Sequence, residues 1–135
     1  MVVAHDIHVA IRSDVDIVLA RQQGRNLAAD IGFTAIDATL IATAISELAR
    51  NIVAYAQRGE VILRSIESAN KRGIMIIARD GGPGIRNIND ALRDGYSTSG
   101  GLGLGLPGVK RLVDEFSIES QLRQGTTVSV KKWLR

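Results

Sequence analysis

Two polar side chains in the middle of the chain have the types and the spacing that phosphate chemistry needs. Glu47 and Asn51 are four residues apart in a helical pattern, so both lie on one face of the expected helix. A carboxylate beside a carboxamide suits Mg²⁺, which prefers oxygen ligands and substrate phosphates. The carboxylate could instead activate a hydroxyl group or a water molecule for attack on a phosphoryl group. Taken alone, the pair is also compatible with an ordinary solvated helix face.

A second candidate is the glycine-rich run from Ser97 to Gly108, in which leucines alternate with glycines. Glycines let a ligand approach the backbone, and a helix that begins inside such a run presents free N–H groups to an anion. Interleaved leucines are unusual in a solvated linker, so we interpret the run as a phosphate-binding lid. It lacks the Gly-Lys-Ser/Thr of a Walker A loop, and its match to the dinucleotide fingerprint has no preceding strand.

The remaining candidates are two turns beside expected strands. Asp80 ends one strand and is followed by Gly82 and Gly84, while Thr126 begins the last strand. A carboxylate in this position can accept a hydrogen bond from the exocyclic amine of a base, and the glycines let a flat ring approach the backbone. Each segment considered separately is equally typical of a plain turn.

Hydrophobic periodicity predicts the elements that position these motifs: five strands and three main helices. The expected strands cover residues 6–13, 60–68, 73–79, 116–122 and 126–133; the expected helices cover 14–31, 34–57 and 106–115, with a short helix at 89–93. Short turns at 69–72 and 123–125 join neighbouring strands, so the sheet must be at least partly antiparallel. We therefore predict an α+β fold, a two-layer α/β sandwich with a mixed, largely antiparallel sheet.

The composition indicates a single domain spanning residues 1–135. Hydrophobic residues make up 45% and charged residues 23%, which is ordinary for a folded protein and excludes intrinsic disorder. The chain has no cysteine, no apparent secretory signal and no apolar stretch long enough for a bilayer, so we expect a cytoplasmic protein without a membrane segment. A net charge of only +3 argues against nucleic acid as a partner.

The order of the four motifs resembles that of the Bergerat-type (GHKL) ATPases and kinases, which include gyrase, the Hsp90 chaperones and the histidine kinases. Within this superfamily, the stretches Ile45–Ile52 and Asp94–Arg111 are most similar to the RsbT-type switch protein serine/threonine kinases, an anti-sigma-factor kinase family. The resemblance covers nearly the whole chain. A histidine kinase is excluded, because His5 and His8 lie in or beside an expected strand and not on a separate dimerising helical region.

For catalysis, the resemblance implies a Mg·ATP-dependent protein serine/threonine kinase. Asn51 would hold Mg²⁺, and Glu47 would act as the general base on the hydroxyl group of the substrate. The γ-phosphoryl group would pass to serine or threonine in a single step.

For nucleotide binding, the resemblance implies that Asp80 binds the amino group of adenine. Gly82 and Gly84 would shape the pocket for the base, and Thr126 would contribute a hydroxyl group on its far side. The lid residues expected to close over the phosphates are Ser99, Gly101, Leu102, Gly103, Leu104 and Gly105.

The resemblance also implies protein partners. The expected substrates are STAS-domain proteins of a stressosome-type partner-switching pathway, and the kinase would also bind and activate a PP2C-type phosphatase. One alternative is an anti-sigma factor that sequesters a sigma subunit of RNA polymerase and phosphorylates its anti-anti-sigma partner. Another is a module that binds nucleotide without catalysis. The sequence leaves a homodimer open and does not locate the docking surface.

Overall fold

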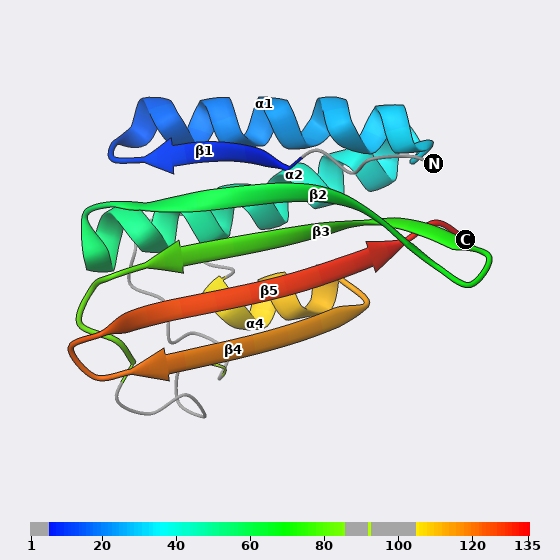
Figure 1. The fold of residues 1–135 in the computed structure, drawn as a ribbon. Helices are drawn as coiled ribbons and strands as arrows, with labels where there is room; N and C mark the ends of the chain where they lie inside the picture. Colours follow the sequence, from blue (N-terminus) through cyan, green and yellow to red (C-terminus); the bar gives the residue numbers. More distant parts are fainter. Residues whose placement is uncertain (1–5, 86–91, 93–104) are drawn as a thin grey trace.

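The computed structural model describes residues 6–85, 92 and 105–135, and these form a sheet covered by helices on one face (Figure 1). The sheet has the strand order β1-β2-β3-β5-β4, and all of its pairings are antiparallel. In chain order the elements are β1 (Ile7–Ile11), α1 (Asp14–Ile31), α2 (Ala35–Asn51), the π-helix η1 (Ile52–Ala56), β2 (Gly59–Ser68), β3 (Lys71–Asp80), α4 (Gly105–Leu112), β4 (Glu115–Gln121) and β5 (Gly125–Trp133). This architecture confirms the predicted two-layer α+β fold.

The core lies between the sheet and the helices. One row of side chains crosses the whole sheet in register, from Val9 through Val61, Ala78 and Val128 to Ile118. The first four of these residues are buried, and Ile118 packs at the edge of the same cluster. Because side chains alternate between the two faces of a strand, the apolar alternation seen in the sequence places this row under the helices.

Helix α2 runs through the middle of the core and brings the candidate residues to the sheet. It begins at a threonine cap, where the hydroxyl group of Thr34 accepts a hydrogen bond from the amide of Asp37 at 3.1 Å. Its apolar face includes Ile41, Ile45 and Leu48, all almost fully buried. The helical spacing of these residues made the helix predictable, and their burial orients the opposite, polar side of α2.

The observed elements differ from the predicted ones mainly at their ends. The expected helix over 34–57 is an α-helix only to Asn51 and continues as the π-helix η1, and it stops at Gln57, whose φ is 69°. Gly59 was expected to close this helix, but it is the first residue of β2 and pairs with Asp80. A hydrophobic pattern reports which face is buried; it does not report where the hydrogen-bond spacing changes.

Two other element boundaries also differ from the predicted ones. The turn expected over residues 69–72 contains only Ala69 and Asn70, because β3 already begins at Lys71. Helix α4 begins at Gly105 and ends at Leu112, earlier than the predicted 106–115, and β4 then starts at Glu115. The short helix expected at 89–93 lies outside the described residues except for Leu92. In the described part of the chain, no helix is both long enough and apolar enough to span a bilayer.

Candidate functional site

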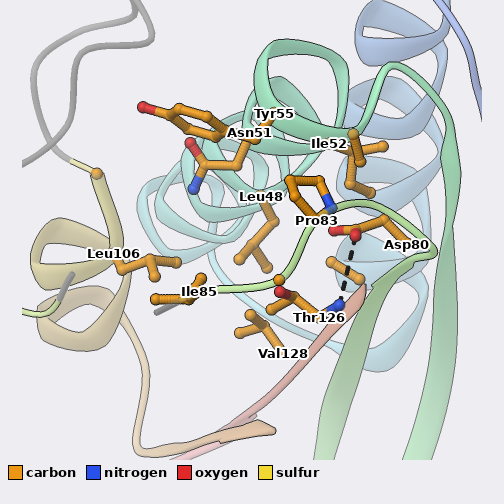
Figure 2. A pocket seen from close by; sticks show the side chains of 14 residues that line it. Leu48, Asn51, Ile52, Tyr55, Asp80, Pro83, Ile85, Leu106, Thr126 and Val128 are labelled. Carbon is orange, nitrogen blue, oxygen red and sulfur yellow. Dashed lines mark hydrogen bonds between the residues drawn. The ribbon is translucent and has the colours of Figure 1, made fainter. Parts of the chain in front are cut away.

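A cavity of about 330 Å³ lies where α2 and η1 meet the ends of β3 and β5 and the start of α4. Figure 2 shows side chains from all of these elements converging on it. Its lining residues are Leu48, Asn51, Ile52, Tyr55, Ala56, Ala78, Asp80, Pro83, Gly84, Ile85, Gly105, Leu106, Thr126 and Val128. An apolar hollow with a few polar groups is the usual form of a small-molecule site. We refer to it below as the nucleotide cavity.

Asp80 and Thr126 form the polar end of the nucleotide cavity. They face each other as a register pair between β3 and β5. One carboxylate oxygen of Asp80, Oδ1, accepts hydrogen bonds from the amide of Gly82 at 2.9 Å and from the amide of Thr126 at 3.3 Å (dashed line in Figure 2). These two bonds fix the orientation of the carboxylate, so it lies ready to accept a hydrogen bond from a ligand that carries an amine.

Two glycines allow the backbone around Asp80 to close this tightly. Gly125 has a φ of 115°, and a Cβ atom there would lie 2.0 Å from the carbonyl oxygen of Asp80. Gly84 has a φ of 80°, and its Cβ atom would lie 2.3 Å from the carbonyl oxygen of Gln121. Both positions therefore exclude any side chain for conformational and for steric reasons. Both glycines belong to the motifs found in the sequence: Gly84 to the turn after Asp80, and Gly125 to the Gly-Thr pair that begins the last strand.

Asn51 lies at the last position of α2, directly before η1, and reaches the wall of the nucleotide cavity. Its side-chain oxygen Oδ1 is buried and has no hydrogen-bond partner among the described residues. A buried carboxamide oxygen without a hydrogen-bond partner lowers the stability of the folded protein by about 1–3 kcal/mol. The presence of asparagine at this position despite that cost points to a ligand that contacts it. Mg²⁺ accepts such an oxygen while keeping phosphates and waters as further ligands, and Asn51 therefore fits the expected metal.

Glu47 lies one helical turn before Asn51 on α2 and lines a different hollow. It does not line the nucleotide cavity; it lines a second hollow of about 360 Å³ between α1 and α2, which we call the arginine cavity. The lining residues of the arginine cavity are Arg21, Gln22, Arg25, Ala42, Thr43, Ser46, Glu47 and Arg50. Glu47 is only 1% exposed, and its Oε1 lies 3.9 Å from Nε of Arg50. The two predicted catalytic residues are thus neighbours on one helix that face separate hollows.

Two of the other predicted site residues lie at the nucleotide cavity or beside it. Gly82 contributes its amide to Asp80, and Gly105 is the first residue of α4 and lines the nucleotide cavity. The lid residues Ser99, Gly101, Leu102, Gly103 and Leu104 lie outside the described residues. The structure thus brings Asn51, Asp80, Gly84, Gly105 and Thr126 together around one cavity. Gly82 lies beside it, and Glu47 lines the arginine cavity one helical turn before Asn51.

The sequence did not single out several residues that shape the nucleotide cavity. Tyr55, on η1, and Ile85, after the Asp80 turn, belong to its lining. Ser120 lies beneath it on β4 and hydrogen-bonds to its walls. Pro83 and Gly84 gave a turn signal that places Ile85 nearby, whereas nothing in the local pattern around Ser120 distinguishes it from other polar strand residues.

Comparison with known proteins agrees with this geometry. Residues 36–135 match the family described as histidine kinase-, DNA gyrase B-, and HSP90-like ATPase. The chain is 54% identical over 127 residues to the serine/threonine-protein kinase RsbT of Bacillus subtilis (strain 168), covering 94% of this chain and 96% of that protein. It is 30% identical over 98 residues to an anti-sigma F factor of Clostridium kluyveri, covering 70% and 69%.

An anti-sigma F factor of Geobacillus thermodenitrificans is 31% identical over 101 residues, covering 70% of this chain and 68% of that protein. The ATPase match includes every residue that lines the nucleotide cavity. These similarities confirm the resemblance inferred from the four motifs. The chain therefore belongs to the histidine kinase-, DNA gyrase B- and HSP90-like ATPase family, in the group that contains RsbT and the anti-sigma F factors.

Proposed function

We propose that this chain is a Mg·ATP-dependent protein serine/threonine kinase that acts in a partner-switching pathway. The single observation that supports this most strongly is the convergence of Asn51, Asp80 and Thr126 on one cavity, in a chain 54% identical to the kinase RsbT. A carboxamide oxygen, a carboxylate and a hydroxyl group at the rim of an apolar hollow suit a purine nucleotide with its metal ion.

In this proposal, the nucleotide cavity holds ATP by its two ends. The carboxylate of Asp80, oriented by the amides of Gly82 and Thr126, accepts a hydrogen bond from the amino group of adenine. The ring packs against the apolar lining, which includes Ile52 and Val128. At the other end Asn51 holds Mg²⁺, which when bound would neutralise negative charge on the phosphates. The lid residues 99–105 close over those phosphates.

Glu47 acts as the general base in this proposal. It lies one helical turn before Asn51 on α2, so the acceptor hydroxyl group would meet it at the phosphate end of the bound nucleotide. There Glu47 orients the hydroxyl group and takes its proton while the γ-phosphoryl group is transferred.

The proposed substrates are STAS-domain proteins of the stressosome type, and the proposed second partner is a PP2C-type phosphatase that is activated on binding. The 54% identity to the serine/threonine-protein kinase RsbT, over 94% of this chain, supports both proposals. We place the protein in the cytoplasm, where such partners would be found. The sequence similarity to anti-sigma F factors supports a second candidate, an anti-sigma factor that sequesters a sigma subunit and phosphorylates its anti-anti-sigma partner.

The decisive experiment is transfer of radiolabelled phosphate from Mg·ATP to a panel of STAS-domain proteins. We expect labelling of serine or threonine in at least one of them by the natural chain. Glu47→Ala should reduce the rate by about 10²–10⁴-fold, the usual contribution of a general base. Glu67→Ala, which changes an exposed glutamate on β2, serves as the matched control and should leave the rate unchanged.

Binding of ATP to the Glu47→Ala variant is measured alongside transfer, because retained binding shows that the variant is folded. ATP binding without transfer to any STAS protein would contradict the proposed kinase. Capture of a sigma subunit from a panel of purified subunits, in the presence of ATP, would then favour the anti-sigma factor.

A further inference from the structure

Ser120 ties together three segments that surround the polar end of the nucleotide cavity. It lies on β4, half-buried, and its hydroxyl oxygen accepts a hydrogen bond from the amide of Ile85 at 2.7 Å. The same hydroxyl group donates to the carbonyl oxygen of Gly125 at 3.2 Å and lies 2.8 Å from the hydroxyl oxygen of Thr126. Ser120 therefore connects the turn after Asp80 with the start of β5.

The hydrogen atoms available to these groups determine the direction of each bond. A serine hydroxyl group has one hydrogen atom to donate and two lone pairs to accept with. The carbonyl oxygen of Gly125 can only accept, so the hydrogen atom of Ser120 goes to it. The hydroxyl group of Thr126 must then donate to Ser120, whose second lone pair receives the amide of Ile85. Every hydrogen-bonding capacity of Ser120 is used in this arrangement.

This pattern has a consequence for the ligand, because Thr126 lines the nucleotide cavity. With its hydrogen atom committed to Ser120, the hydroxyl group of Thr126 offers the cavity only lone pairs. The neighbouring carboxylate of Asp80 is likewise an acceptor when ionised. Two adjacent acceptors match a donor group on the ligand and repel a carbonyl oxygen in the same position.

We propose that Ser120 is a positioning residue that holds Thr126 as a hydrogen-bond acceptor and so makes the nucleotide cavity selective for a base with an exocyclic amine. The inference rests on the proposed binding of ATP and deepens it, because it assigns part of the base specificity to a residue outside the cavity wall. Ser120 acts through Thr126 and through the position of Ile85, without contact to the nucleotide.

The test compares the dissociation constants of Mg·ATP and Mg·ITP, measured by calorimetry. Inosine carries a carbonyl oxygen where adenine carries its amino group, and its N1 donates a hydrogen bond where N1 of adenine accepts one; the sugar and the phosphates are the same. In Ser120→Ala, the hydroxyl group of Thr126 becomes free to rotate and to donate. We expect ATP binding to weaken about fivefold, the worth of one hydrogen bond, while ITP binding weakens little or improves, so that the ATP/ITP preference falls.

Two controls separate positioning from general disruption of the strand. Ser117→Ala removes an exposed hydroxyl group from the same strand, and it should change neither dissociation constant. Ser120→Thr keeps the hydroxyl group and should retain most of the ATP/ITP preference. Should Ser120→Ala fail to fold, Thr126→Val provides the same readout, because it keeps the side-chain shape, removes the hydroxyl group and should also lower the preference.

The outcomes distinguish the inference from the function on which it rests. An equal loss of affinity for ATP and ITP in Ser120→Ala would show a merely structural role and overturn the inference, as would an unchanged preference. When Ser120→Ala is added to Thr126→Val, the ATP/ITP preference of the folded double variant should be no lower than that of Thr126→Val alone. Fully additive effects of the two substitutions would contradict coupling between Ser120 and Thr126. Failure of the natural chain to bind either nucleotide would refute the proposed function itself.

Discussion

Asn51 in the nucleotide cavity and Glu60 on the outer face of the sheet differ in whether their side-chain oxygens have hydrogen-bond partners. In the cavity, Oδ1 of Asn51 is buried and has no partner among the described residues. On the outer face, the carboxylate of Glu60 on β2 hydrogen-bonds to Arg79 on β3 and, at 3.3 Å, to His8 on β1, the neighbouring strand on the other side. The first polar group carries an energetic penalty that its surroundings do not relieve, whereas the second is satisfied by its neighbours.

This difference separates groups retained for a ligand from groups that serve the fold. The hydrogen bond from Arg79, followed by that from His8, lowers the pKa of Glu60. Such exposed ion pairs add little stability, and they leave no capacity for a ligand. Among the described residues nothing offsets the burial of this oxygen of Asn51, and a cation or a hydrogen-bond donor that enters the cavity would offset it. A buried polar group without a hydrogen-bond partner is therefore more informative for locating the site than an exposed ion pair.

The largest effect is expected from Asn51→Ala. Loss of the carboxamide oxygen should reduce Mg·ATP turnover by about 10²-fold or more, because the phosphates lose the ligand that positions their metal ion. The free energy of unfolding should not fall, since the variant removes a buried unsatisfied group and introduces a strong helix former. Phosphate transfer and urea denaturation measure the two quantities.

Asn26→Ala is the matched control for this variant, because it removes an exposed carboxamide from α1. Its turnover should equal that of the natural chain. Normal turnover by Asn51→Ala would remove the distinction between the two regions and contradict the proposed metal ligand.

An intermediate effect is expected from Gly125→Ala, which tests how tightly the cavity is built. The new Cβ atom would lie 2.0 Å from the carbonyl oxygen of Asp80 at a φ of 115°. We expect a loss of about 1–3 kcal/mol in the free energy of unfolding and weaker ATP binding, because Asp80 must move. Gly81→Ala is the control, since a Cβ atom there meets nothing within 4 Å. Equal stability of both variants would show that the close approach is unimportant.

The smallest effect is expected from Glu60→Gln on the outer face. The pKa of Glu60 is lowered from its ordinary value of 4.5, so the pair stabilises the fold above that pH and loses its contribution as the pH falls through the lowered value. After screening by solvent, we expect at most about 0.5 kcal/mol at pH 7 and a smaller difference from the natural chain in acid. Unfolding curves recorded at pH 7 and in acid measure this difference in the free energy of unfolding. The affinity for ATP should not change.

The predictable parts of the molecule are those in which a local pattern has one physical cause. Alternation of apolar residues such as Ile74 and Ile76 predicted β3, because a half-buried strand must bury every second side chain. The turn residues around Gly84 indicated close backbone approach for the same kind of reason. The change from α-helix to π-helix after Asn51 was not predictable, since both forms keep an apolar face on the sheet.

The sequence by itself determined the two-layer fold and the order of the motifs, because periodicity and motif order are properties of the chain. The motifs also indicated Asn51, Asp80 and Thr126 as candidate site residues. Only the tertiary structure decided that Glu47 faces the arginine cavity while Asn51 faces the nucleotide cavity. Helical spacing predicts that two side chains share a face, but it does not specify what covers each of them. The packing of α1 and α4 against α2, together with its contacts to η1 and β3, determines which hollow each side chain lines.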